Sequence, residues 1–145
     1  MAVAPKLRQP YLRVPSAANG KLRVLVVDDE IAFGKVMREV LELFGMEVRL
    51  AFGAAQALEQ MRRETPDLLM VDIMMPEVDG LSLIRRVQKE SVWLGIPIIV
   101  VSARASKADQ HEALFAGADA FLAKPFTADE LRQALRPFLP AGTSL

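Results

Sequence analysis

The chain has 145 residues, of which 52% are hydrophobic, and this is enough for one ordinary globular domain with a real core. It has no cysteine and a single histidine, His111, which excludes disulfides, thiolate sites and histidine-rich metal clusters. The formal net charge is zero, so there is no overall basic signature for nucleic acid, and the apolar runs are too short to span a membrane.

The first 21 residues differ from the rest in charge. They contain four basic residues and no acidic one, together with three prolines. Because these residues contain no apolar stretch long enough for a signal peptide, we interpret residues 1–21 as a flexible basic extension. A role in binding nucleic acid is disfavoured, because four separated charges would give only modest affinity. Residues 22–138 are predicted to form the domain, and residues 139–145 a C-terminal tail.

Strand and helix patterns alternate from residue 21 onward. An apolar, β-branched run predicts a strand over 21–27. Apolar residues at three- and four-residue spacing then predict a helix that stops at Gly45. Its inward face is expected to consist of Ile31, Val36, Met37, Val40, Leu41 and Phe44. Residues 47–52 alternate as in a second strand, and residues 54–63 have the pattern of a second helix.

The second half of the chain repeats this pattern three times. Strands are predicted at 68–71, 96–101 and 120–122, and helices after Gly80, over 106–116 and over 127–136. Thr127 and Glu130 form a capping-box sequence at the start of the last helix. Five strand–helix pairs with apolar strands predict an α/β fold, a doubly wound five-stranded parallel sheet covered by five helices.

Polar side chains follow four of the predicted strands. Asp28 and Asp29 follow the first strand, Asp72 the third, Ser102 the fourth and Lys124 the fifth. Parallel strands bring their carboxyl ends to one edge, where ligands of such sheets bind. At about 4 Å each carboxylate pair repels by roughly 1–4 kcal/mol, so a divalent cation and Lys124 are expected to compensate. Each acid alone could equally be a helix cap or a solvated loop end.

Four segments resemble the receiver domains of two-component response regulators. They are VLVVDDE at 24–30, VDIMMPEVDG at 71–80, VVSA at 100–103 and GADAFLAKPF at 117–126, and the resemblance covers roughly residues 22–138. It implies the flavodoxin-like strand order 2-1-3-4-5. It also implies a cytoplasmic signalling protein that catalyses its own phosphotransfer and dephosphorylation and is not a metabolic enzyme.

The resemblance implies a phosphorylation site with bound Mg²⁺. Asp72 corresponds to the phosphoacceptor, which attacks the phosphohistidine of a partner kinase. Asp29, Asp72 and the backbone carbonyl of Met74 correspond to direct magnesium ligands, and Asp28 to an acid that holds the metal through water.

Other matching positions are implied to respond to the phosphoryl group. Ser102 and Lys124 correspond to the pair that contacts its oxygens, and Phe121 to an aromatic switch that moves inward when Ser102 engages. Met74 and Arg104 flank this position, where they either tune dephosphorylation or are ordinary rim residues.

The implied partners are proteins. They are a sensor histidine kinase or phosphotransfer protein and a downstream target on the face of the fourth helix, fifth strand and fifth helix, with a homodimer as a further option. No DNA-binding domain follows in the sequence, so the expectation is a stand-alone receiver without a membrane span.

Three alternatives remain open from sequence. The first is a pseudo-receiver that binds partners without phosphorylation. The second is an aspartate-nucleophile phosphatase of the haloacid dehalogenase type, which is disfavoured because Asp28 and Asp29 are adjacent and there is no room for a cap domain. The third is a nucleotide- or flavin-binding module, which the acids after the first strand disfavour.

Overall fold

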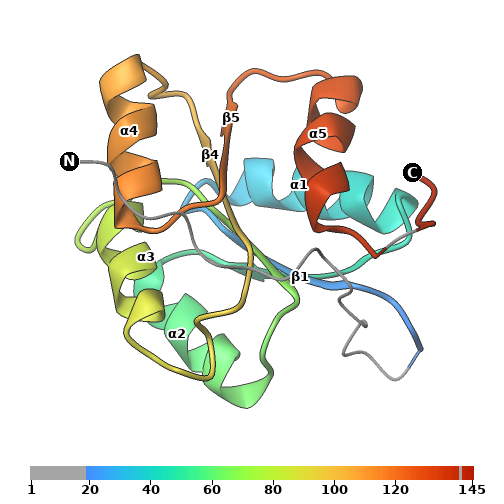
Figure 1. Cartoon of the computed structure of the whole chain (residues 1–145), viewed down its shortest axis with the longest axis horizontal. Coiled ribbons are helices and arrows are strands. Elements are labelled where there is room, and N and C mark those ends of the chain that lie inside the picture. Colours follow the sequence, from blue (N-terminus) through green and yellow to red (C-terminus); the bar gives the residue numbers. More distant parts are fainter. Residues whose placement is uncertain (1–18, 141) are drawn as a thin grey trace.

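The computed structural model describes residues 19–140 and 142–145, so most of the predicted N-terminal extension lies outside the described residues. Five strands form one parallel sheet in the order β2-β1-β3-β4-β5, which confirms the predicted topology (Figure 1). The strands are β1 (Arg23–Val27), β2 (Glu47–Ala51), β3 (Leu68–Val71), β4 (Ile98–Ser102) and β5 (Ala120–Ala123).

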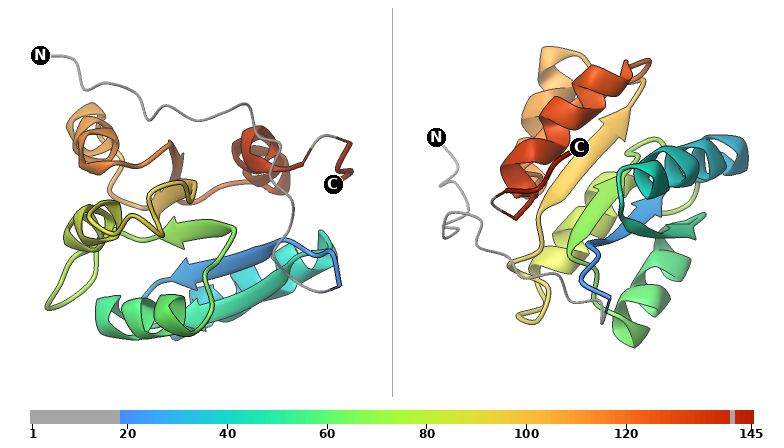
Figure 2. Two further views of the ribbon diagram at one scale, coloured as in Figure 1. Left: turned by 60° about the horizontal axis from the view of Figure 1, so that its bottom comes forward. Right: turned by 90° about the vertical axis from the view of Figure 1, so that its right-hand side faces the viewer.

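Helices cover both faces of this sheet (Figure 2). They are α1 (Ile31–Leu43), α2 (Ala54–Arg63), α3 (Gly80–Gln88), α4 (Lys107–Ala116) and α5 (Ala128–Leu135), followed by the 3-10 helix η1 (Arg136–Phe138). Two helices, α1 and α5, pack on one face, and α2, α3 and α4 pack on the other. The longest helix has 13 residues, and no helix in the described part of the chain could span a membrane.

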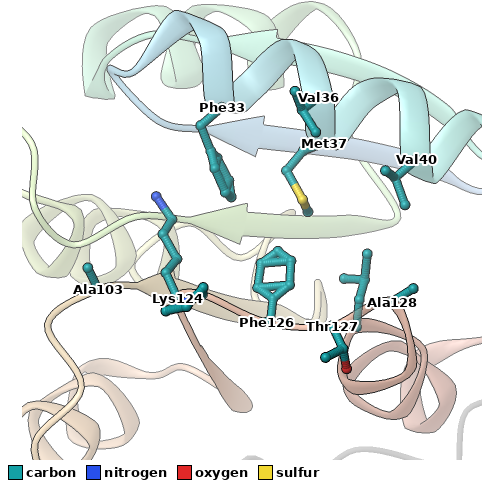
Figure 3. A pocket seen from close by; sticks show the side chains of 11 residues that line it. Phe33, Val36, Met37, Val40, Ala103, Lys124, Phe126, Thr127 and Ala128 are labelled. Carbon is teal, nitrogen blue, oxygen red and sulfur yellow. The ribbon is translucent and has the colours of Figure 1, made fainter.

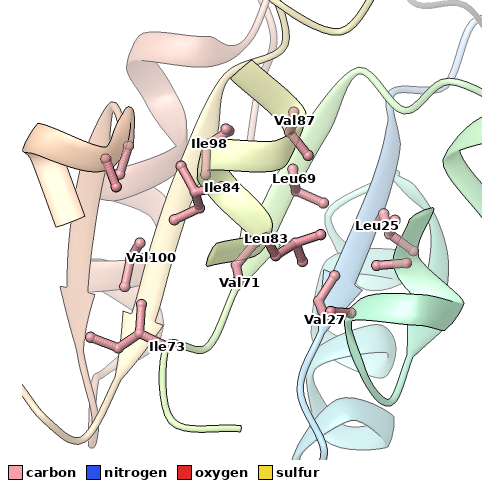
Figure 4. Close-up of a cluster of buried hydrophobic side chains, with 14 of the residues drawn as sticks. Leu25, Val27, Leu69, Val71, Ile73, Leu83, Ile84, Val87, Ile98 and Val100 are labelled. Atoms are coloured by element: carbon pink, nitrogen blue, oxygen red, sulfur yellow. The ribbon is translucent and has the colours of Figure 1, made fainter. Parts of the chain in front are cut away.

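Two hydrophobic clusters fill the space between the sheet and its helices. In β1, Leu25 and Val27 face α2–α4, whereas Val24 and Val26 face α1 and α5. Because both faces are covered, the strands are continuous apolar runs rather than alternating ones. Figure 4 shows the first cluster, in which side chains of β1, β3 and β4 pack against those of α3. This packing fixes the strand ends that carry the polar residues.

Several predicted details differ in the structure. The fourth strand was predicted over 96–101 but runs from Ile98 to Ser102. Ser102 is therefore the last residue of β4 and not the first residue after it. The prediction that Ile31 and Val36 point inward is wrong, because they are 52% and 58% exposed. The apolar stripe of α1 is wider than the face that the sheet covers.

The C-terminal end of the chain also packs against the core. Pro137 lies within η1, and Phe138 is buried. From the predicted tail, Leu139 and Leu145 pack against the cluster beneath α1 and α5.

The strand register brings the polar ends level with one another. Val27 of β1 pairs with Val71 of β3, so Asp28 and Asp72 follow directly from paired residues. Ser102 of β4 likewise pairs with Ala123 of β5, the residue before Lys124. Backbone bonds extend both pairings, because the N–H of Asp72 donates to the Val27 carbonyl and that of Lys124 to the Ser102 carbonyl. The sheet therefore delivers these side chains to one edge.

Candidate functional site

Three carboxylates converge at the carboxyl edge of the sheet. Each of Asp28, Asp29 and Asp72 places an oxygen within 4.8 Å of the others. Asp28 and Asp72 are buried, whereas Asp29 is exposed to solvent. Anionic oxygens grouped in this way are the donors that Mg²⁺ and Ca²⁺ prefer, and an exposed member leaves a route of entry. The predicted acidic set therefore comes together and fits a hard divalent cation.

Lys124 lies across this cluster. Its Nζ donates hydrogen bonds to Asp28 Oδ2 at 2.8 Å and to Asp72 Oδ2 at 3.3 Å. Its side chain is 16% exposed, and the peptide bond to Pro125 is cis. A buried carboxylate pair needs a compensating charge, which the ammonium group supplies.

The pKa values of Asp72 and Lys124 reflect both burial and neighbouring charges. Burial raises the pKa of Asp72 above its usual value, and the Met74 N–H and the Lys124 charge only partly oppose this. Burial alone would lower the pKa of Lys124, but its hydrogen bond and charge interaction with Asp28, aided by Asp72, raise it. The ammonium is therefore retained, while the Asp72 carboxylate is held at a cost in free energy.

We expect Asp72→Asn to stabilise the fold at neutral pH. A raised pKa means that folded Asp72 binds a proton more readily than unfolded Asp72, so wild-type stability falls as pH rises from the unfolded value, 3.8, through the folded one. Asparagine does not ionise, so the variant does not lose this stability as the pH rises. Urea unfolding from about pH 4 to about pH 7.5 should show its advantage growing with pH. An advantage that stayed constant or shrank would contradict this expectation.

Ser102 is completely buried at the end of β4. Its Oγ accepts the backbone N–H of Arg104 at 3.1 Å. Phe121, the predicted switch aromatic, is half-buried in β5 opposite Val100 and packs against the cluster under α2–α4. The two predicted switch residues thus lie on adjacent strands. Because Val71 pairs with Val100, Ser102 lies one residue beyond the position on β4 that is level with Asp72.

The two predicted flanking residues line one hollow beside the site. Met74 is 51% exposed, and its N–H donates to Asp72 Oδ1 at 2.9 Å. Arg104 has an exposed side chain whose Nε donates to Asp109 Oδ1 at 2.9 Å. Met74 and Arg104 share a cavity of about 350 Å³ with Asp79 and Glu112, among others. Arg104 is thus bound to α4.

Sequence reasoning missed an aromatic partner of Lys124. The ring centroid of Phe33, in the first turn of α1, lies 3.7 Å from Lys124 Nζ. Phe33 also meets Phe126 edge-on, with ring centroids 6.1 Å apart. Figure 3 shows Phe33 reaching from α1 toward Lys124 and Phe126 across a cavity of about 570 Å³. The only sequence signal was an aromatic residue shortly after the acids of the first strand end.

We expect Phe33 and Lys124 to be energetically coupled. A buried ammonium over an aromatic face gains about 0.5–2 kcal/mol, so the cycle of Phe33→Leu and Lys124→Met should give a coupling of about 1 kcal/mol. Urea unfolding of the four proteins measures it. Val36→Ala is the matched control, because Val36 lies on the same helix, is 58% exposed and should show no coupling. A coupling near zero for Phe33 would show that its contact with Lys124 is only steric.

Comparison with known proteins identifies similar chains and folds. The response regulator receiver domain family matches residues 24–136. Response regulator MprA of Mycobacterium leprae is 41% identical over 118 residues, which cover 81% of this chain and 51% of that protein. Transcriptional regulatory protein TrcR of Mycobacterium tuberculosis is 36% identical over 133 residues, 92% of this chain and 51% of that protein. The chain therefore spans about half the length of these curated relatives.

Solved structures show the same architecture. Chemotaxis protein CheY4 of Vibrio cholerae superposes with a TM-score of 0.78 at 28% identity, covering 82% of this chain and 99% of that one. A putative response regulator from Chloroflexus aurantiacus superposes with a TM-score of 0.76 at 29% identity, covering 81% and 98%. Both matches take in nearly the whole of the other chain, so the sheet and its helices correspond to one complete structural unit.

Proposed function

The chain belongs to the response regulator receiver family, and from this premise we propose that Asp72 accepts a phosphoryl group from the phosphohistidine of a partner histidine kinase. The observation that carries the proposal is the Lys124 ammonium bound to both Asp28 and Asp72, with Asp29 within reach of both acids. Receiver domains are signalling modules and not metabolic enzymes, and they generally bind Mg²⁺ in an acidic pocket.

The proposed transfer is a substitution at phosphorus. An Asp72 oxygen bonds to phosphorus while the bond to the histidine nitrogen breaks, and the nitrogen keeps the electron pair. A carboxylate is a weak nucleophile, so catalysis depends on positioning and charge. Lys124 supports the step because its ammonium already lies 3.3 Å from Asp72 and can meet charge on the phosphoryl oxygens. When bound, Mg²⁺ would supply further neutralisation of those oxygens.

We propose that Asp28, Asp29, Asp72 and the Met74 carbonyl hold the metal. Magnesium that binds only the folded protein stabilises it, by about 2.7 kcal/mol at a hundredfold excess over Kd. Urea unfolding with and without Mg²⁺ should therefore show a clear gain for the wild type and a much smaller one for Asp29→Asn. Asp29 is exposed, so its substitution should not disturb the fold.

Glu30→Gln is the matched control for the metal site. Glu30 is the next residue, is also exposed and lies outside the acidic cluster. The same stabilisation by Mg²⁺ is expected for this variant as for the wild type. Equal gains for Asp29→Asn and wild type would contradict the proposed ligand set.

The proposed output is a protein contact on the face of α4, β5 and α5. On α4 the buried side chains at 113 and 116 are alanines, whereas Leu114 and Phe115 are 45% and 65% exposed. Large apolar side chains directed outward favour a partner surface. A downstream target or a second copy of the chain would supply this partner surface. The proposed location of the protein is the cytoplasm, in keeping with its family.

Incubation with acetyl phosphate, followed by intact mass measurement, tests the phosphoacceptor proposal. One adduct is expected that requires Mg²⁺ and is removed by hydroxylamine, which cleaves acyl phosphates. Sustained hydrolysis of a phosphomonoester would favour a phosphatase instead. No adduct from acetyl phosphate, phosphoramidate or a phosphorylated histidine kinase would contradict the proposal.

A further inference from the structure

The loop between β4 and α4 is fixed to the first turn of α4 by one buried carboxylate. Asp109 is 8% exposed, and its Oδ1 accepts Arg104 Nε at 2.9 Å. Its Oδ2 accepts the backbone N–H of Ser106 at 3.0 Å and the Ser106 hydroxyl at 2.7 Å. Gln110 adds a bond from its side-chain amide to the Ala105 carbonyl at 3.1 Å. The loop and the start of α4 therefore form one connected unit.

The same loop also holds Ser102. The backbone N–H of Arg104 donates to Ser102 Oγ at 3.1 Å, and Ser102 is fully buried at the end of β4. Residue 104 thus has two roles, because its backbone binds the serine and its side chain binds α4. Ser102 and α4 are therefore connected through a single residue, Arg104.

The ionic character of this link persists at physiological pH. The hydrogen bonds from Ser106, helped by the charge of Arg104, hold the pKa of Asp109 below its usual value. The carboxylate is therefore charged at neutral pH. The guanidinium is in turn kept on α4, on the wall of the cavity that Met74 also lines.

We propose that the Arg104–Asp109 ion pair is a latch that holds Ser102 and α4 in the unphosphorylated arrangement. The proposal rests on the proposed function, in which Ser102 moves to bond a phosphoryl oxygen on Asp72. That movement must either open the ion pair or displace α4 together with the loop, and both cost free energy. The pair therefore opposes activation, and Arg104 acts as a positioning residue.

Beryllofluoride, a phosphoryl mimic, tests the latch in the presence of Mg²⁺. Arg104→Met keeps the backbone N–H and the length of the side chain but removes the ion pair. An ion pair at a partly exposed site contributes modestly to stability. The beryllofluoride concentration that half-saturates Arg104→Met should therefore be about three- to fivefold lower than that for the wild type. Arg104→Lys should return toward the wild-type value. Lys107→Met is the matched control, because Lys107 is exposed in the same helical turn and should leave half-saturation unchanged.

Amide hydrogen exchange without ligand supplies a second readout. In Arg104→Met the amides of residues 103–110 should exchange faster, and in Lys107→Met they should not. Unchanged exchange would overturn the latch whether or not the wild type binds beryllofluoride. If the wild type fails to bind beryllofluoride, the proposed function is contradicted. The exchange result alone then decides whether the latch exists. Weaker binding by Arg104→Met would show that Arg104 contacts the phosphoryl group, which also overturns the proposal.

Discussion

Asp72→Asn is expected to reduce the phosphoryl adduct formed from acetyl phosphate and Mg²⁺ to background. The amide has nearly the same shape as the carboxylate but lacks its nucleophilic oxygen. Intact mass spectrometry of wild type and variant, labelled side by side, measures the effect.

Asp79→Asn is the matched control for this loss of labelling. Asp79 lies in the same loop, is exposed, and caps α3 by accepting the N–H of Ser82 at 2.8 Å. Asparagine caps helices as well as aspartate does, so this variant should label like the wild type. An adduct that survived in Asp72→Asn and was lost in Asp79→Asn would place the acceptor elsewhere.

The arrangement of the site could be predicted from sequence because a parallel sheet imposes it. Once five apolar strands are recognised, the residues that follow them must share one edge, and Asp28, Asp72 and Lys124 do. Local signals were also sufficient for the capping box of α5, where Thr127 and Glu130 exchange hydrogen bonds at 3.1 Å. Both inferences depend on chain order or on neighbours three residues apart.

Contacts between elements could not be predicted in this way. Periodicity identifies an apolar stripe on α1, but it does not reveal that the sheet covers only part of it and leaves Val36 exposed. The contact between Phe33 and Lys124 joins residues 91 positions apart, and no local pattern pairs them. Asp109 looks like an ordinary capping residue until the conformation of the loop brings Arg104 onto it. Such pairings depend on side-chain packing, which the sequence pattern does not encode locally.

One glycine links the stability of the fold to the position of Asp72. Gly80 is the first residue of α3, and its N–H donates to the Ile73 carbonyl at 3.3 Å. A Cβ at this position would overlap the Asp72 carbonyl oxygen and lie 2.6 Å from the Ile73 Cα. Both are backbone atoms and cannot rotate away. The start of α3 therefore packs directly on the segment that carries Asp72, and only glycine permits this approach.

We expect Gly80→Ala to destabilise the protein by about 3 kcal/mol, at the upper end of the usual cost of overpacking. Urea unfolding measures it, and any folded variant should also label more slowly, because relief of the overlap displaces Asp72. Gly95→Ala is the control, since a Cβ there meets nothing within 4 Å and should change stability by less than about 0.5 kcal/mol. Alanine has a higher helix propensity than glycine by about 1 kcal/mol. The measured loss of stability in Gly80→Ala would therefore understate the cost of the steric overlap itself. Equal stabilities for the two variants would show that the overlap is relieved at little cost and would contradict this expectation.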